Sequence, residues 1–158
     1  MEKNHKRILI SILIVVSLIS IMDILFLKSG MFGSPEDYTN GNYLAGLWPL
    51  FFKLSLSIMI IFSGVYYFYY RRDISETIAI FLGSYALWSY FGISDILYFW
   101  FQGKMVPSTL PWLSHNVALQ PVANILGYTT ITNTSLYVSA VIGIIVIYYT
   151  SKILKEKF

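Results

Sequence analysis

Three ionisable side chains interrupt apolar stretches of this sequence, namely Asp23, Lys53 and Asp95. An ionised group costs about 2.5–3.5 kcal/mol at the centre of a bilayer and less toward its surface, so such residues usually face the interior of a helical bundle and pair there. With two acids and one base, one acid has no basic partner. When two carboxyl groups lie close together, one of them tends to keep its proton. Such a proton would suit general acid–base catalysis or proton coupling.

Counting residues places the three side chains at one depth. Asp23 and Asp95 lie near the ends of apolar runs, and Lys53 lies near the start of another. At 1.5 Å per helical residue, all three fall within roughly 6–9 Å of the same membrane face. We therefore predict an ion pair between Lys53 and one of the acids. This pair either lines a polar pocket or, if the side chains extend to the lipid headgroups, forms a structural salt bridge alone.

His115 belongs to a segment with several Gly and Pro residues that follows Asp95. Two carboxylates and one imidazole can bind a transition metal. Asp23, Asp95 and His115 come from three separate segments without the spacing of a metal-binding motif, so we predict no metal site. We expect His115 to be a hydrogen-bonded residue at the pocket, and the sequence indicates no particular cofactor. Cysteine is absent, which excludes disulfides and thiolate ligands.

Aromatic side chains accompany this polar cluster along the chain. Trp88 and Phe99 flank Asp95 at helical spacing, and Trp112 lies in the segment that follows. Pockets for small molecules are lined mainly by apolar and aromatic groups, with a few polar groups that orient the ligand. The residues that we predict to bind a ligand are Asp23, Lys53, Trp88, Asp95, Phe99, Trp112 and His115.

The elements that must position these residues are apolar helices. The chain of 158 residues is 56% hydrophobic and 12% charged, whereas a soluble domain carries about 25% charged residues. About 20 apolar residues cross a bilayer as a helix, and a helix satisfies its own backbone hydrogen bonds in lipid. We therefore predict an all-α integral membrane protein, in which residues 1–158 form a single membrane domain and a four-helix bundle. Its predicted spans are residues 8–27, 47–70, 74–101 and 135–151.

The third predicted span, 74–101, contains the central acid of the cluster. We expect a continuous helix here, which would stack Trp88 and Asp95 on one face. Gly92 beside Asp95 would then permit close approach of a neighbouring helix. At the start of this span, Asp73 and Glu76 have the spacing of a capping box, so we interpret both as structural.

Two long connections separate the predicted spans on the outer side. Residues 28–46 and 102–134 contain Gly, Pro and polar residues in the proportions of loops. Loops of this length are often lids or binding loops. In the second loop, residues 117–126 are apolar enough for a short interfacial helix. We expect this partly helical loop to cover the pocket.

Lysine and arginine set the predicted orientation. Most of the eleven lie on one side of a four-span bundle, and the opposite connections hold Lys28 and Lys104. Positively charged residues flank spans on the cytoplasmic side, so we predict a multi-pass protein of the cell membrane with both termini in the cytoplasm. Because these residues mark topology, we expect no nucleic acid partner. The residues of the predicted cytoplasmic side are Lys3, Lys6, Arg7, Arg71, Arg72, Lys152, Lys155 and Lys157.

One short stretch recurs in the sequence. Asp23 begins an Asp-Ile-Leu triplet that returns at Asp95, 72 residues later. The recurrence makes a parallel repeat of two helical hairpins a candidate architecture. Chance is the alternative, since Ile and Leu are abundant here. Prolines related by the same offset are Pro35 with Pro107 and Pro49 with Pro121.

These features predict a small polytopic membrane protein with a polar pocket near the outer membrane face, which binds a lipid-like or small amphipathic ligand. The expected partners are membrane lipid, other membrane subunits or further copies of the chain. Two alternatives stay open. The protein is a non-catalytic subunit of a larger membrane complex, or it is a membrane enzyme or proton-coupled carrier that uses the paired aspartates. The sequence does not decide whether the chain is an enzyme.

Overall fold

The computed structural model describes residues 2–28, 44–70, 73–113 and 116–157. Within these ranges the regular structure is helical, apart from one isolated β-bridge between Thr109 and Thr132. The helices are α1 (Glu2–Lys28), α2 (Leu44–Tyr69), α3 (Ile74–Ser89), α4 (Ile93–Phe101), the 3-10 turn η2 (Pro111–Leu113), α5 (Leu119–Ile125) and α6 (Asn133–Lys157).

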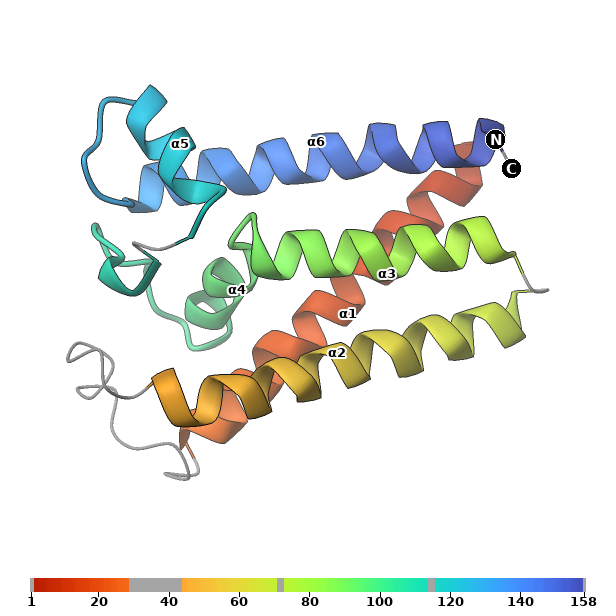
Figure 1. Ribbon diagram of the computed structural model, residues 1–158, viewed down its shortest axis with the longest axis horizontal. Helices are drawn as coiled ribbons and strands as arrows, with labels where there is room; N and C mark the ends of the chain where they lie inside the picture. Colours follow the sequence, from red (N-terminus) through yellow and green to blue (C-terminus); the bar gives the residue numbers. More distant parts are fainter. Residues whose placement is uncertain (1, 29–43, 71–72, 114–115, 158) are drawn as a thin grey trace.

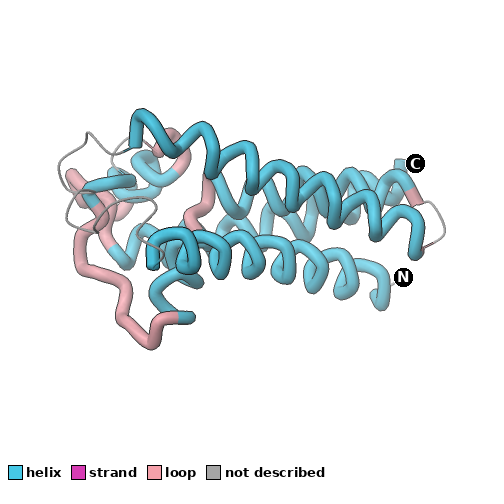
Figure 2. Tube along the Cα trace, turned by 90° about the horizontal axis from the view of Figure 1, so that it is seen from below, coloured by secondary structure: helices cyan, strands magenta, loops and turns pink. Residues whose placement is uncertain are grey.

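Helices α2, α3 and α6 lie lengthwise along the molecule, and α1 runs obliquely across it (Figure 1). One end of the molecule holds both chain termini, and we call it the terminal end. Helices α1 and α3 begin there, and α2 and α6 end there. The opposite end carries α4, η2 and α5, and we call it the loop end. Figure 2, which is turned by 90°, shows the same division, with most of the connecting segments gathered at the end away from the termini.

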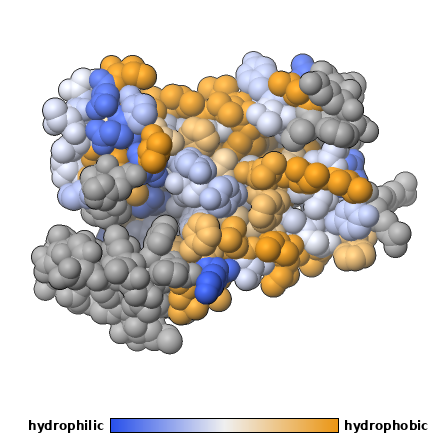
Figure 3. Space-filling view, viewed as in Figure 1, coloured by the Kyte–Doolittle hydropathy of each residue, from blue (hydrophilic) through white to orange (hydrophobic). Residues whose placement is uncertain are grey.

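Length and composition allow several of these helices to cross a membrane. Among the described residues three stretches qualify alone, Lys6–Leu25, Leu50–Tyr69 and Asn133–Ile153, and α3 with α4 would add a fourth if the bent pair is one span. Large apolar side chains point outward from them; Phe68 is 75% exposed and Ile61 is 66% exposed. Hydrophobic surface covers much of the face in Figure 3. An apolar exterior of this extent marks contact with another apolar phase, so the chain has the character of a membrane protein.

Helix α3 forms the centre of the packing. It contacts α1, α2 and α6, and its buried Ile80 and Leu87 join the main hydrophobic core. Small residues allow these contacts to be close. A Cβ atom added to Gly83 would lie 2.5 Å from Ile12 Cδ1 on α1 and 3.3 Å from Ile147 Cγ2 on α6. Packing of this kind, through small residues at helix crossings, is typical of membrane bundles.

Gly143 provides a testable example of the same packing. A Cβ atom at this position would lie 2.5 Å from Phe91 Cγ and 2.8 Å from Phe91 Cβ. We expect Gly143→Ala to lower the free energy of unfolding by about 1–3 kcal/mol, as overpacking of a filled core does. Gly64→Ala is the matched control, because an added Cβ at Gly64 has no neighbour within 4 Å and alanine favours helix by about 0.5–1 kcal/mol. Thermal unfolding in detergent compares the two variants; equal midpoints would contradict the predicted clash.

The third predicted span is broken. α3 ends at Ser89 and α4 begins at Ile93, with a bend of 72° between them, so the continuous helix predicted over 74–101 is wrong. The N–H groups of Tyr90 and Phe91 both donate to Ala86 O, at 2.9 and 3.2 Å. Gly92 then takes a φ of 65°, a left-handed conformation that glycine adopts without a steric penalty and that ends helices.

The break changes the neighbours of Asp95. In the predicted continuous helix, Asp95 would stack on Trp88; in the structure it lies in the first turn of α4. The side chain of Leu136 occupies the place that a Cβ atom on Gly92 would need. Gly92 therefore permits the close helix approach that the sequence suggested, but as part of a bend rather than within a helix.

The described residues of 102–134, which exclude 114 and 115, pack as a layer at the loop end. Leu110 N donates to Ile131 O at 2.9 Å, and Asn133 N donates to Ser108 O at 3.3 Å, which joins the two ends of the layer. Helix α5 lies inside the stretch 117–126 that we expected to be helical, and it packs against α6. The side chains that this layer buries are Val106, Leu110, Leu119, Ala123 and Ile131.

Asn116 joins this layer to the end of α3. Its Oδ1 accepts hydrogen bonds from the N–H groups of Ala118 and Leu119, at 3.0 and 3.1 Å, and its Nδ2 donates to Ser89 O at 3.1 Å. Side-chain oxygens of Asn commonly satisfy the free N–H groups before and at a helix start. One side chain thus both starts α5 and satisfies a carbonyl at the end of α3.

The two Asp-Ile-Leu stretches lie in different kinds of helix. Asp23 belongs to the long α1, whereas Asp95 belongs to the short α4 that follows the bend. Pro49 lies in the long α2 and Pro121 in the short α5, while Pro35 lies outside the described residues. The structure therefore does not give the two halves of the candidate repeat one common architecture.

Candidate functional site

The contact between α1 and α4 brings the two predicted acids together. Across this contact Ser20 Oγ donates to Ser94 O at 3.4 Å, and within α1 it donates to Val16 O at 2.9 Å. Asp23 lies about one turn further along α1, and Asp95 directly follows Ser94. The carboxyl groups of Asp23 and Asp95 interact electrostatically. Two acids that are far apart in the sequence thus meet where α1 ends near the loop end.

The local environment of Asp95 follows from the bend. Because α4 begins at Ile93, Asp95 lies in its first turn, where free backbone N–H groups and the helix dipole favour a carboxylate. Ser94 Oγ donates to Trp88 O at 3.4 Å, which ties the start of α4 to α3. Both Asp23 and Asp95 are partly buried. This arrangement can accept hydrogen bonds from a cationic or proton-donating group that approaches both acids.

Lys53 does not complete the predicted trio. Its side chain is exposed on α2, and its carbonyl accepts a hydrogen bond from Ser57 Oγ at 2.8 Å. In the part of the chain that the structure describes, no ion pair joins Lys53 to Asp23 or Asp95. The prediction of that ion pair is wrong, because equal depth in the membrane does not specify which way a helix faces.

Trp88, predicted to line the pocket, belongs to the core. It is 5% exposed and packs against Phe51, Phe52 and Tyr85, with ring centroids 6.2, 5.5 and 6.3 Å away. Tilted ring pairs at these separations are typical of core packing. Phe99 is partly buried and packs against the main core, with its ring edge to face against Tyr98 at 5.2 Å.

Two further predicted site residues lie partly or wholly outside the residues that the structure describes. Trp112 belongs to η2, but its side chain lies outside the described residues, as does all of His115. Among the residues that the structure does describe, no group of three or more His, Asp or Glu side chains gathers in a way that could hold a metal ion.

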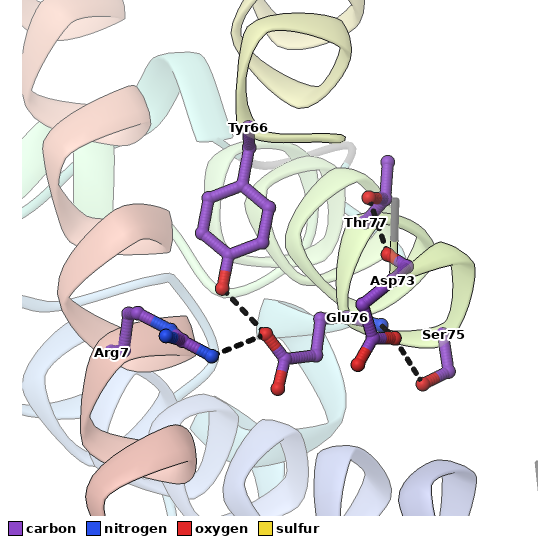
Figure 4. Close-up of polar contacts among 6 residues, drawn as sticks. All are labelled: Arg7, Tyr66, Asp73, Ser75, Glu76 and Thr77. Atoms are coloured by element: carbon purple, nitrogen blue, oxygen red, sulfur yellow. Dashed lines mark hydrogen bonds and ion pairs between the residues drawn. The ribbon is translucent and has the colours of Figure 1, made fainter. Parts of the chain in front are cut away.

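A second polar cluster, which we had not predicted, lies at the terminal end (Figure 4). Arg7 Nη2 on α1 donates to Glu76 Oε2 on α3 at 2.9 Å, and Tyr66 Oη on α2 donates to the same oxygen at 2.6 Å. The Glu76 side chain is 1% exposed and that of Arg7 is 35% exposed. The guanidinium carbon of Arg7 also lies 4.6 Å from the centroid of the Tyr70 ring, within the range of a cation–π contact. Three helices therefore meet around one buried carboxylate.

The capping role predicted for Asp73 is present beside this cluster. Asp73 Oδ1 accepts from Glu76 N at 3.0 Å and from Ser75 Oγ at 2.8 Å, and its carbonyl accepts from Thr77 Oγ1 at 2.7 Å. Asp73 is thus the N-cap of α3, as predicted. The side chain of Glu76 has a larger role than the predicted capping box, because it joins α3 to α1 and α2.

A groove of about 600 Å³ opens beside this second cluster, between α1 and α2. It is lined by the basic Lys6 and Arg7, by hydroxyl-bearing side chains such as Ser11 and Tyr69, and by apolar side chains such as Ile10 and Val65. This groove lies at the terminal end, whereas we predicted a pocket at the other end of the bundle. The two polar clusters found among the described residues are thus separated along the helices.

Comparison with known protein families, with curated proteins and with solved structures finds no match to this chain.

The Arg7–Glu76 pair could have been found by the depth argument that selected Asp23 and Asp95. Arg7 directly precedes the first predicted span, and Glu76 lies near the start of the third. Both positions face the same membrane side in the predicted topology. We assigned Glu76 to a helix cap instead, because the capping-box spacing explained it locally.

Proposed function

We propose that the chain forms one membrane domain that crosses the cell membrane four times, with α3 and α4 as one bent span and both termini in the cytoplasm. α1 begins and α6 ends at the terminal end, where α2 also ends and α3 begins. Lys6 and Arg7 near the start of α1 and Lys152 near the end of α6 lie on that side, and Lys104 follows α4 on the other. This distribution supports the orientation, because basic residues concentrate on the cytoplasmic side.

At the loop end, we propose that the protein binds a lipid-like or small amphipathic ligand whose polar group meets Asp23 and Asp95. The observation that carries this proposal is the contact of α1 with α4, which places two partly buried carboxyl groups of like charge together. Like charges repel, and the repulsion is stronger where water is partly excluded. An amine or another cationic head would relieve it through charge-assisted hydrogen bonds.

The layer formed by residues 102–134 supports this proposal in a second way. The layer packs at the loop end, where Asp23 and Asp95 lie. Hydrogen bonds connect its segments to one another and to the end of α3. Exposed apolar groups such as Trp100, 60% exposed, lie on α4 close in sequence to Asp95. An amphipathic ligand would place its apolar part along such side chains and its polar head at the acids.

Conservative substitutions of the two acids test the ligand site. In a neutral detergent, we expect a long-chain alkylamine to raise the unfolding midpoint of the protein, and the alcohol of the same chain length to raise it less. Asp23→Asn and Asp95→Asn should each weaken the apparent affinity for the amine by about tenfold or more, the value of one hydrogen bond with a charged group. Ser57→Ala, exposed on α2, is the control that should bind normally. An undiminished amine effect in the double Asn variant would overturn the proposal.

The same variants separate the alternatives. If Asp23 and Asp95 share a proton, the protein is better explained as a proton-coupled carrier or enzyme. In that case the wild type would bind the amine only weakly, and the Asn variants would abolish proton exchange in vesicles. A partner protein that stays bound through gentle detergent extraction, and is released by substitutions in residues 102–134, would instead identify a subunit of a larger complex.

A further inference from the structure

The groove between α1 and α2 has a charged end and an apolar length. Arg7, Ile10 and Ile14 line it from α1 at helical spacing, and Phe62 and Val65 line it from α2. The distance from Arg7 to Ile14 along a helix is about 10 Å. Ile10, Ile14 and Val65 are 57%, 45% and 61% exposed. The groove therefore runs from the terminal end toward the middle of two candidate spans, open on the side that a membrane would cover.

Contacts beside the groove hold Arg7 in place. Its Nη2 is bonded to Glu76 and its guanidinium lies over Tyr70. A guanidinium has five N–H donors, and the hydrogen bond from Nη2 to Glu76 is the one that the described residues show for it. Glu76 compensates the charge of Arg7, whereas the described residues show no ion pair for Lys6, which is exposed. The groove thus combines a positioned donor, an exposed cation and a largely apolar and aromatic wall.

We propose that this groove binds an anionic phospholipid, with the phosphate at Lys6 and Arg7 and one acyl chain along Ile10, Ile14 and Val65. Charge complementarity selects the anionic head, because basic pockets between spans on the cytoplasmic side bind such headgroups. The exposed apolar length selects a lipid over a free anion, because an anion leaves that surface uncovered. This site lies at the opposite end of the bundle from Asp23 and Asp95, and it does not depend on them.

The test compares three probes on purified protein in a neutral detergent. Phosphatidylglycerol, phosphatidylcholine with the same acyl chains, and inorganic phosphate are added separately, and the unfolding midpoint is followed. We expect phosphatidylglycerol to raise the midpoint more than phosphatidylcholine does, and inorganic phosphate to leave it unchanged. Because a ligand at free concentration L that binds the folded state stabilises it by RT ln(1 + L/Kd), a lipid titration then gives an apparent affinity.

Two variants address the two halves of the groove. Lys6→Gln removes the exposed cation, and we expect an apparent affinity for phosphatidylglycerol about fivefold weaker, as for one lysine near an anionic surface. Val65→Trp fills the apolar half from an exposed position and should abolish the difference between lipid and phosphate. Lys152→Gln is the matched control, since this exposed lysine near the end of α6 lies at the same end of the bundle without lining the groove.

Each outcome decides the proposal. An equal loss in Lys152→Gln and Lys6→Gln would show attraction by overall charge and would overturn a local site. Stabilisation by inorganic phosphate alone, unaffected by Val65→Trp, would show a free-anion site instead. A preference for phosphatidylglycerol that falls in Lys6→Gln and in Val65→Trp, and survives in Lys152→Gln, supports the lipid groove.

Discussion

Glu76→Gln is expected to lower the free energy of unfolding by about 1.5–3 kcal/mol, the range for hydrogen bonds that involve a charged group. The buried Glu76 carboxylate accepts from both Arg7 and Tyr66, so its replacement weakens contacts among α1, α2 and α3 at once. Glutamine keeps the shape but removes the charge, and it leaves the guanidinium of Arg7 without its ionic partner. Thermal or denaturant unfolding in detergent, followed by circular dichroism, measures the effect.

A double-mutant cycle separates the ion pair from packing. Arg7→Met should destabilise the protein by itself, because it leaves the charge of Glu76 buried without that partner. The combination Arg7→Met with Glu76→Gln should be less destabilising than the sum of the two single changes, since neither charge is then left alone. Tyr66→Phe removes only the second hydrogen bond and should have a smaller effect, about 0.5–1.5 kcal/mol. Strict additivity in the cycle would show that Arg7 and Glu76 do not stabilise each other.

The second large effect is expected at Gly92. Gly92→Ala should cost about 1–2 kcal/mol for a left-handed backbone at a residue with a Cβ and about 1–3 kcal/mol more for overpacking, because Leu136 occupies the position that the Cβ needs. The strain falls at the bend between α3 and α4, so the change should also displace Asp95 from Asp23. We expect a lower unfolding midpoint together with weaker binding of the alkylamine probe.

Gly103→Ala is the matched control for this change. Gly103 has nearly the same φ, 66°, but an added Cβ there has no neighbour within 4 Å, so it tests the backbone strain alone. Adding Leu136→Ala to Gly92→Ala should recover part of the loss that comes from the clash, although the leucine side chain itself is then missing from the core. Equal destabilisation by Gly92→Ala and Gly103→Ala would show that Leu136 does not restrict the bend.

Glu76 and Gly92 explain how the two polar clusters seen among the described residues arise. The Glu76 cluster joins the long helices at the terminal end, and the Gly92 bend turns α4 so that Asp95 meets α1 at the loop end. A straight continuation of α3 would have kept Asp95 in register with Trp88, whose side chain is in the core. The bend therefore lets Asp95 come soon after α3 in the chain without placing its side chain in the hydrophobic core.

Apolar composition and the positions of polar residues were enough to predict the long helices. The predicted stretches 8–27 and 135–151 lie inside the longer helices α1 and α6, and 47–70 overlaps nearly all of α2, because an apolar run of this length bounded by charged or turn-forming residues has few alternatives to a helix. The cap at Asp73 was predictable for a similar reason, since its interactions are with residues that follow it directly in the chain.

Side-chain partners depended on tertiary structure. Counting residues showed that Asp23, Lys53 and Asp95 lie at the same depth, but it did not show which way each helix faces. In the structure, the side chain of Lys53 is exposed on α2. Periodicity did not predict the bend at Gly92, because the apolar pattern of 74–101 continues through it. The residue that packs against the bend, Leu136, comes from the distant helix α6. The sequence by itself determined where helices form and which charges interrupt them. The rotation of each helix about its axis, set by packing against its neighbours, decided which charges meet.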